Sequence, residues 1–354
     1  MDASMSGEDA ELVERIRQIK RRKGDELVIL GHHYQRREIV ELSDYRGDSL
    51  QLSRNAAERK DARYIVFCGV KFMAESAAIL AGENQVVQHP EPTAGCPMAD
   101  MADLEDVERA WAQITEICGQ DRVIPVTYVN SSTDVKAFVG RHGGATCTSS
   151  NALKLFEWAF SQKEKLFFLP DQHLGTNTAN VMGIPRDERI IWDFTQPELG
   201  GNGEEEIRRA KLILWSGHCH VHIWFTVDHI LKARRRYPDG KIVVHPECVE
   251  DVVNLADYNG STAFIVRFVE EAPAGSTTVI GTEINLVSRL AYENPDKTVV
   301  ELSRSLCPNM YKINLRNLLY TLEHLGEVNV VKISDEVKHY AGLALNRMLE
   351  ATAK

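Results

Sequence analysis

Residues 31–53, GHHYQRREIVELSDYRGDSLQLS, directly follow the apolar run ELVIL of residues 26–30. His32, His33 and Tyr34 therefore stand where a buried strand is expected to end, and Gly-Asp-Ser then opens an expected helix. In open α/β sheets, ligands bind outside the carboxyl ends of the strands. The position of these titratable side chains thus indicates a functional site on an α/β fold.

Short β-rich runs alternate with helical stretches along the rest of the chain. Residues 8–23 carry apolar residues at helical spacing, and Gly24 closes the stretch. Further apolar runs are expected to be strands, at residues 26–30, 64–68, 123–129, 165–169, 241–245, 277–281 and 298–302. Continuous apolar strands separated by helices are typical of parallel sheets covered on both faces, so the pattern predicts an α/β protein.

The order of these elements recurs three times, which predicts a triplicated unit. Each unit begins with a strand that ends in polar residues: VILGHHYQ (28–35), VTYVNSST (126–133) and IVVHPEC (242–248). A helix and a turn follow, in CGVKFMAE (68–75), CTSSNA (147–152) and NGSTAF (259–264). A further strand leads into VVQHPEPT (86–93), FFLPDQHLG (167–175) and VIGTEINL (279–286). Each unit closes on a cysteine, in TAGCPMA (93–99), WSGHCHVH (215–222) and RSLCPNM (304–310).

The spacing within the units supports the repeat and indicates one insertion. His32 to Cys96 and His245 to Cys307 are nearly equal distances along the chain, whereas Asn130 to Cys219 is longer. The hydrophilic stretch TQPELGGNGEEEIRRAK (195–211) accounts for the difference as an expected surface insertion.

Three units arranged about a pseudo-threefold axis would direct their strand ends toward one central cavity. The predicted domains are 1–106 (with the N-terminal helix), 107–232 (with the insertion), 233–325 and a C-terminal segment and helix at 326–354.

Three of the seven cysteines, Cys96, Cys219 and Cys307, occupy the same place in the three units. Three soft thiolates without a recurrent fourth suggest either a zinc site or an iron–sulfur cluster with one open metal position. Catalytic metal sites leave such a position open, and the metal can then act as a Lewis acid. The alternative is three unrelated buried cysteines, which is what we expect of Cys68 and Cys118.

Composition restricts the class of partner. The chain has 354 residues, and its formal charge of −10 argues against nucleic acid or an anionic membrane as the main partner. It does not argue against small anionic substrates. No run approaches the length of a membrane span, and the N-terminus has no apolar signal region, so a cytoplasmic protein is expected.

Polar residues cluster at the predicted strand ends and helix starts. Asp48-Ser49, Thr148-Ser149 and Ser261-Thr262 each precede an expected helix, where they can serve as N-caps or help to bind an anion. The other candidates are His32, Tyr34, Tyr128, Asn130, His222, His245 and Glu247. The carboxylate beside a histidine in HPE (245–247) is suited to general acid–base chemistry.

Taken in order, the motifs HHYQ, GDSLQLS, GVKFMAESAAIL, GCPMA, YVNSS, CTSSNA, PDQHLG, GHCHVH, VHPEC, GSTAF, GTEINL and CPNM resemble those of the quinolinate synthase family. The resemblance covers about residues 8–350. It implies a transferase of de novo NAD biosynthesis, built from three homologous αβα-sandwich domains around a central active site. It also implies one [4Fe-4S] cluster per chain, held by Cys96, Cys219 and Cys307.

The resemblance further implies the reaction and the residues that carry it. Iminoaspartate and dihydroxyacetone phosphate would condense to quinolinate, phosphate and water, with an open iron assisting dehydration. An aspartate oxidase or dehydrogenase would supply the iminoaspartate. Substrate-binding positions would be His32, Tyr34, Ser49, Tyr128, Asn130, Ser149, His222, His245, Glu247, Ser261 and Thr262. Among these, Glu247 is expected to be the general base, Tyr128 and His32 to polarise oxygens, Tyr34 to close the site, and His222 to take part in catalysis.

Three other functions remain open on the residues alone. An aconitase-like hydratase also uses three cysteines and an open iron, and a zinc-dependent lyase would use histidine and cysteine ligands. A non-catalytic iron or redox sensor would need a partner-binding module, for which the acidic chain has no basic helix. Some family members carry CxxCxxC around the third ligand, but only Cys307 is present here, so a disulfide switch is not expected.

Overall fold

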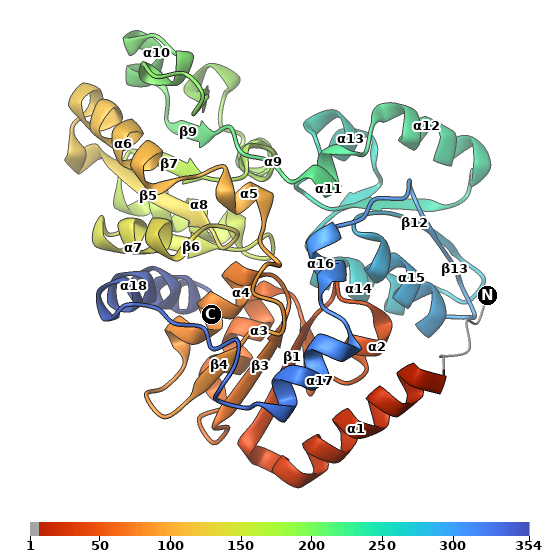
Figure 1. Cartoon of the computed structure of the whole chain (residues 1–354). Coiled ribbons are helices and arrows are strands. Elements are labelled where there is room, and N and C mark those ends of the chain that lie inside the picture. Colours follow the sequence, from red (N-terminus) through yellow and green to blue (C-terminus); the bar gives the residue numbers. More distant parts are fainter. Residues whose placement is uncertain (1–6, 354) are drawn as a thin grey trace. The chain divides into compact units, whose positions relative to one another are not determined.

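The computed structural model describes residues 7–353, so the outer limits of the first and last predicted domains lie outside the described residues. The chain forms two compact units (Figure 1). Unit 1 comprises Met1–Gly95 and Cys307–Ile333, and unit 2 comprises Cys96–Leu306 and Ser334–Lys354.

Unit 1 contains one four-stranded parallel sheet in the order β2-β1-β3-β4. Its strands are β1 (Leu27–His32), β2 (Tyr45–Gly47), β3 (Tyr64–Cys68) and β4 (Val86–Gln88). The connecting helices are α2 (Arg37–Val40), α3 (Ser49–Glu58) and α4 (Lys71–Leu80). Helices α1 (Gly7–Lys23), α16 (Pro308–Lys312) and α17 (Leu315–Glu323) complete the unit.

The core of unit 1 follows from two apolar patterns. Every residue of β1 is buried, as a strand covered on both faces requires. The predicted helix over 8–23 is confirmed as α1, which buries Val13, Ile16 and Ile19 in one cluster with Leu318 of α17. Each of these fully buried aliphatic side chains contributes about 1.5–3 kcal/mol relative to its exposed state.

Unit 2 contains two parallel sheets. The first has the order β6-β5-β7-β9-β8, with strands β5 (Val123–Tyr128), β6 (Ala145–Cys147), β7 (Lys165–Leu169), β8 (Arg189–Trp192) and β9 (Leu212–Trp215). The second has the order β11-β10-β12-β13, with strands β10 (Lys241–Val244), β11 (Tyr258–Asn259), β12 (Thr277–Gly281) and β13 (Thr298–Glu301). The helices of the first sheet are α6 (Leu104–Cys118), α7 (Thr133–Arg141), α8 (Ala152–Gln162), α9 (Gln172–Met182) and α10 (Glu204–Arg209). Those of the second are α12 (Val227–Arg236), α13 (Glu250–Leu255), α14 (Thr262–Glu271) and α15 (Ile284–Glu293).

The predicted fold class is confirmed: residues 7–353 form an α/β fold with three small, all-parallel sheets. In each sheet, the second strand in the sequence lies on one side of the first strand, and the third strand lies on the other side. The last strand of that sheet in the sequence lies beyond the third. This shared order supports the predicted triplication. The pseudo-threefold arrangement, the central site and the domain limits stay predictions.

A recurrent hydrogen bond ties each cysteine loop to its sheet. The first residue of the helix after the third strand donates its N–H to the carbonyl two residues before the cysteine. The three bonds are Lys71 to Ala94 (2.8 Å), Gln172 to Gly217 (2.9 Å) and Ile284 to Ser305 (2.9 Å). Each cysteine then occupies the N-cap position of a short helix without a side-chain cap, namely α5 (Pro97–Asp100), α11 (His220–Ile223) or α16.

The structure corrects one alignment within the predicted repeat. CGVKFMAE (68–75) follows the third strand of its sheet, so it corresponds to FFLPDQHLG and VIGTEINL and not to CTSSNA and NGSTAF. The turn that corresponds to those two is the one at Asp48, between β2 and α3. The error arose because β2 has only three residues and is partly exposed, so it carries no apolar run that marks a strand.

The prediction of a simple surface insertion at 195–211 was also wrong in part. The sheet β6-β5-β7-β9-β8 has an additional edge strand, β8, and the stretch itself contains α10 and the short 3₁₀ helix Leu199–Gly201. Ile207 of α10 is fully buried in the core of this sheet. The buried Lys165 ammonium donates to the carbonyls of Arg208 (2.6 Å) and Ala210 (2.5 Å), which holds the end of α10 against β7.

The C-terminal helix α18 (Asp335–Ala351) packs on α7 and β6 within unit 2 (Figure 1). The approach is close, because a Cβ at Gly140 would lie 1.9 Å from the carbonyl oxygen of Tyr340. The Arg347 guanidinium donates to the carbonyls of Gly140 (3.1 Å) and Gly144 (2.6 Å). Across residues 7–353, none of the helices is both long and apolar enough to cross a membrane.

Candidate functional site

A buried polar cluster lies at the carboxyl ends of the strands of unit 2. Tyr128 is the last residue of β5, and Glu247 stands in the turn just after β10. Thr282 follows β12, and His222 lies on α11, beyond the end of β9. These side chains come from distant parts of the sequence, and each is at least nine-tenths buried.

Glu247 is the centre of the cluster. Its Oε1 accepts a hydrogen bond from the Tyr128 hydroxyl at 2.6 Å, and its Oε2 lies 3.0 Å from His222 Nδ1. Burial alone would raise the pKa of Glu247. The imidazoles of His222 and His245 and the two hydrogen bonds outweigh burial and lower the pKa to about 2. Glu247 is therefore a carboxylate at neutral pH.

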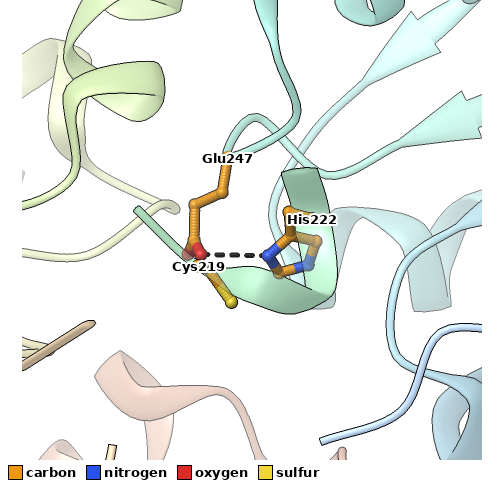
Figure 2. A group of neighbouring side chains, drawn as sticks. All are labelled: Cys219, His222 and Glu247. Atoms are coloured by element: carbon orange, nitrogen blue, oxygen red, sulfur yellow. Dashed lines mark hydrogen bonds and ion pairs between the residues drawn. The ribbon is translucent and has the colours of Figure 1, made fainter. Parts of the chain in front are cut away.

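His222 is held on both sides of its ring. Its Nδ1 faces Glu247, and its Nε2 lies 3.1 Å from the Thr282 hydroxyl. The ring also stacks on His245, with centroids 4.3 Å apart and an interplanar angle of 18°. Figure 2 shows the ring turned toward the Glu247 carboxylate, with the Cys219 sulfur beside them. The orientation of His222 is thus set before any ligand binds.

Asp171 is a second buried carboxylate of unit 2. It caps α9, because Oδ1 accepts the N–H groups of His173 (2.6 Å) and Leu174 (3.0 Å). Its Oδ2 accepts the backbone N–H of Cys219 at 3.2 Å. Burial, and then the charge of Glu247, raise the pKa of Asp171 well above its usual range. This carboxyl group therefore connects the end of β7 to the loop that carries Cys219.

The cysteines divide into two groups by exposure. None of the seven, all of which the structure describes, forms a disulfide, and Cys68, Cys118, Cys147 and Cys248 are buried, which confirms the expectation for Cys68 and Cys118. Cys96, Cys219 and Cys307 are half-buried. In unit 2, burial raises the pKa of the Cys219 thiol, and the charges of Glu247 and Cys96 raise it further. Cys307 is in unit 1, at the start of α16.

These donors are suited to a metal cofactor. Three partly accessible thiols at equivalent positions, none of them in a disulfide, fit the soft-ligand preference of iron–sulfur clusters and of zinc. Ligand atoms of Cys219, His222 and Glu247 also lie within 4.8 Å of one another, a mixed donor set that can hold a single metal ion. The structure is thus compatible with a metal at the carboxyl ends of the strands of unit 2.

The remaining predicted residues of unit 2 lie at helix starts and strand ends. Ser261 caps α14 by accepting from the N–H of Phe264, and Thr262 is the first residue of that helix. Asn130 follows β5, and Ser149 follows β6 in the turn before α8. Because Tyr128 pairs with Cys147 in register, both turns leave the sheet at the same edge.

The turn before α8 carries two buried polar groups that sequence analysis did not select. The Thr148 hydroxyl and the Asn151 amide nitrogen have no hydrogen-bond partner among the described residues. Buried polar groups are normally paired, so groups of this kind suit a ligand. Thr282 and Asp171 were also missed, although both lie within two residues of a strand end in quoted motifs.

Three predicted residues lie in unit 1. His32 is the buried last residue of β1, and its Nδ1 accepts the N–H of Tyr34 at 3.1 Å. The two rings form an edge-to-face pair with centroids 4.9 Å apart. Ser49 begins α3, after Asp48, whose side chain accepts from the N–H of Gln51. The N-cap interpretation therefore holds for Asp48, as it does for Ser261.

Comparison with known proteins gives a consistent result. A family model described as Quinolinate synthetase A protein matches residues 14–350. A quinolinate synthase of Bacillus cereus is 52% identical over 352 residues, which covers 98% of this chain and 94% of the relative. The quinolinate synthases of Bacillus anthracis and Bacillus thuringiensis (strain Al Hakam) match with the same identity and coverage.

Proposed function

The chain belongs to the Quinolinate synthetase A protein family, and from this we propose that it is a quinolinate synthase of NAD biosynthesis. Iminoaspartate and dihydroxyacetone phosphate would condense to quinolinate, phosphate and water. The observation that carries the proposal is the buried Glu247 carboxylate, held between Tyr128 and His222 beside the Cys219 thiol. A base, a phenol, an imidazole and a soft metal ligand thus lie together at the carboxyl ends of the strands of unit 2.

Cys96, Cys219 and Cys307 are the proposed ligands of one [4Fe-4S] cluster per chain. Their equivalent positions and partial exposure support the assignment, because the other four cysteines are buried in the sheets and helices. When bound, such a cluster supplies an iron without a protein ligand, which serves as a Lewis acid for loss of a hydroxyl group.

Glu247 is the proposed general base for proton removal from the triose. As a group with a pKa of about 2 it is a weak base, because Tyr128 and the two histidines stabilise its charge. A substrate oxygen that takes over the Tyr128 hydrogen bond would raise the basicity of Glu247 and be polarised by the same hydroxyl. General acid–base catalysis by such a pair contributes about 10²–10⁴-fold.

His32 and Tyr34 are proposed to act on the substrate from unit 1. The backbone N–H of Tyr34 bonds to His32 Nδ1, so Nε2 of His32 is the nitrogen proposed to polarise an oxygen. Tyr34 is partly exposed, as a side chain that closes over a ligand must be.

Anionic groups of the substrates are proposed to bind at the strand-end turns, through Ser49, Asn130, Ser149, His245, Ser261 and Thr262. The N–H groups at the start of α8 favour negative charge. The unpaired Thr148 hydroxyl and Asn151 amide nitrogen in the same turn support this assignment. His222, bonded at both ring nitrogens, would act mainly by holding Glu247.

The test is quinolinate formation from freshly generated iminoaspartate and dihydroxyacetone phosphate. The protein is purified anaerobically and assayed before and after exposure to air. Product that disappears with air is the expected result, since exposed iron–sulfur clusters with an open iron are oxygen-labile. No product from protein with a full complement of iron would favour a hydratase instead. An aspartate oxidase or dehydrogenase is the proposed source of iminoaspartate and can replace its chemical generation in the assay.

A further inference from the structure

The Cys219, His222 and Glu247 side chains form a compact donor set in which each residue offers one ligand atom (Figure 2). We propose that these three residues are a binding site for a single divalent ion of the zinc class, which is filled when no cluster is present. The site is separate in kind from the proposed cluster because it needs one cysteine, one imidazole and one carboxylate, and neither Cys96 nor Cys307.

The distance between His222 Nδ1 and Glu247 Oε2 fits such an ion. The two atoms are 3.0 Å apart. Zn–N and Zn–O bonds are about 2.0–2.2 Å, so two such ligands in a tetrahedral site lie about 3.3–3.5 Å apart. A shift of a few tenths of an ångström therefore converts the observed pair into two metal ligands.

Cys219 completes the set. Its ligand atom lies within 4.8 Å of the other two, and a tetrahedral zinc site needs about 3.6 Å between sulfur and nitrogen or oxygen. The required movement is about 1 Å, which a small rotation of the cysteine side chain can provide. Cys219 is the half-buried member, so an ion and a water as fourth ligand can enter from its side.

The neighbours of the three residues match the outer partners of metal ligands. A histidine that binds a metal usually donates its other ring nitrogen to an oxygen, and ligating carboxylates are themselves hydrogen-bonded. Here Nε2 of His222 faces the Thr282 hydroxyl at 3.1 Å, and Oε1 of Glu247 accepts from Tyr128 at 2.6 Å.

A metal ion bound here would replace the hydrogen bond between Nδ1 of His222 and Oε2 of Glu247, because both atoms would then direct a lone pair at the metal. Because Cys219 is shared, an ion at this site would exclude the cluster and would occupy the oxygen of Glu247 that faces His222.

The experiment uses the full chain, stripped of metal with a chelator under reducing, anaerobic conditions and titrated with Co²⁺ alone. We expect one Co²⁺ per chain, a thiolate-to-cobalt charge-transfer band in the near ultraviolet, and its loss on addition of Zn²⁺. Cys219→Ser should abolish the band. Glu247→Gln and His222→Gln should each weaken Co²⁺ binding by more than the about 10- to 100-fold that an outer partner costs.

The matched controls are Cys96→Ser and Cys307→Ser, which should keep the band and the affinity. Loss of binding in either control, or unchanged affinity in Glu247→Gln, would place the ion on the three thiols and overturn the proposal. No binding to the unmodified chain would also overturn it. Glu247→Gln keeps the side-chain shape, so its Co²⁺ affinity tests the proposal even if Cys219→Ser fails to fold. Quinolinate is not measured, so this result stands apart from the proposed activity.

Discussion

The buried carboxylate of Asp171 holds the backbone N–H of Cys219 at 3.2 Å while it caps helix α9 with its other oxygen. The loop of Cys219 is also bonded through Gln172 and Gly217, a contact that recurs in all three sheets. In the sheet of unit 1, Val70 occupies the position before α4 that Asp171 occupies before α9, and it makes no side-chain cap. Asp171 is thus an additional anchor for this cysteine.

Replacing Asp171 with Asn should remove the hydrogen bond that the Cys219 N–H donates to Oδ2 of Asp171. An asparagine can keep its oxygen toward His173 and Leu174, but its NH₂ group then faces the Cys219 N–H, and two donors repel. Loss of one such hydrogen bond costs about 1–1.5 kcal/mol, so iron should leave the reconstituted protein about tenfold faster. The measurement is iron released to a chelator over time. Asp103→Asn, at the exposed cap of α6, is the control and should release iron at the parental rate.

Glu247→Gln should keep iron and lose turnover. The amide preserves the shape and can still accept from Tyr128, but it cannot take a proton from the triose. A loss of about 10²–10⁴-fold in kcat is expected for a general base. Quinolinate formation and iron content are measured on the same preparation. Loss of both together would show that Glu247 serves the metal and not the chemistry.

Cys219→Ser should lose the cluster and the activity together, because a serine hydroxyl is a poor ligand for iron. Cys118→Ser is the matched control, since its thiol is buried and faces the Ile207 carbonyl at 3.6 Å in the core of the sheet β6-β5-β7-β9-β8. Iron and inorganic sulfide per chain, with the visible absorbance of the cluster, give the readout. A fully active Cys219→Ser protein would refute the assignment of that ligand.

Much of this architecture could be predicted from single apolar runs. The strands β3, β7 and β12 have the predicted limits, because each is a continuous apolar segment. Strands of two or three residues, such as β6 and β11, were missed, since so short a stretch has no periodicity. Asp171 and Thr282 were missed for a different reason. A carboxylate or hydroxyl after a strand is common, and only the folded chain brings them to Cys219 and His222.

Acid should destabilise the chain in part through His89 of unit 1. Burial lowers the pKa of this histidine, and its Nε2 lies 2.9 Å from the Gly69 carbonyl. In the unfolded chain the pKa of a histidine is about 6.5, so below that pH the unfolded state binds more protons. The stability that His89 contributes is therefore fully present above about pH 6.5 and declines as the pH falls below it.

His89→Gln tests this by removing the titration while leaving an amide that can donate to Gly69. The thermal midpoint of the variant should fall less steeply than that of the parent between about pH 7 and pH 5, the range in which an unfolded histidine takes up its proton. Calorimetry at several pH values gives the slope of the thermal midpoint against pH for the parent and the variant. Equal slopes would show that His89 does not contribute to the loss of stability in acid.

The fit of α18 against α7 depends on the absence of a side chain at Gly140. A methyl group there would lie 1.9 Å from the Tyr340 carbonyl oxygen, and backbone cannot swing aside as a flexible side chain can. Overpacking of this kind costs about 1–3 kcal/mol, so Gly140→Ala should lower the thermal midpoint by several degrees. Gly82→Ala is the control, because its nearest neighbour is the flexible Gln85 side chain at 3.6 Å.

Since α18 also packs on β6, which leads to the Ser149 turn, Gly140→Ala should raise KM more than it lowers kcat. Unchanged kinetics with a lowered midpoint would confine the role of α18 to stability.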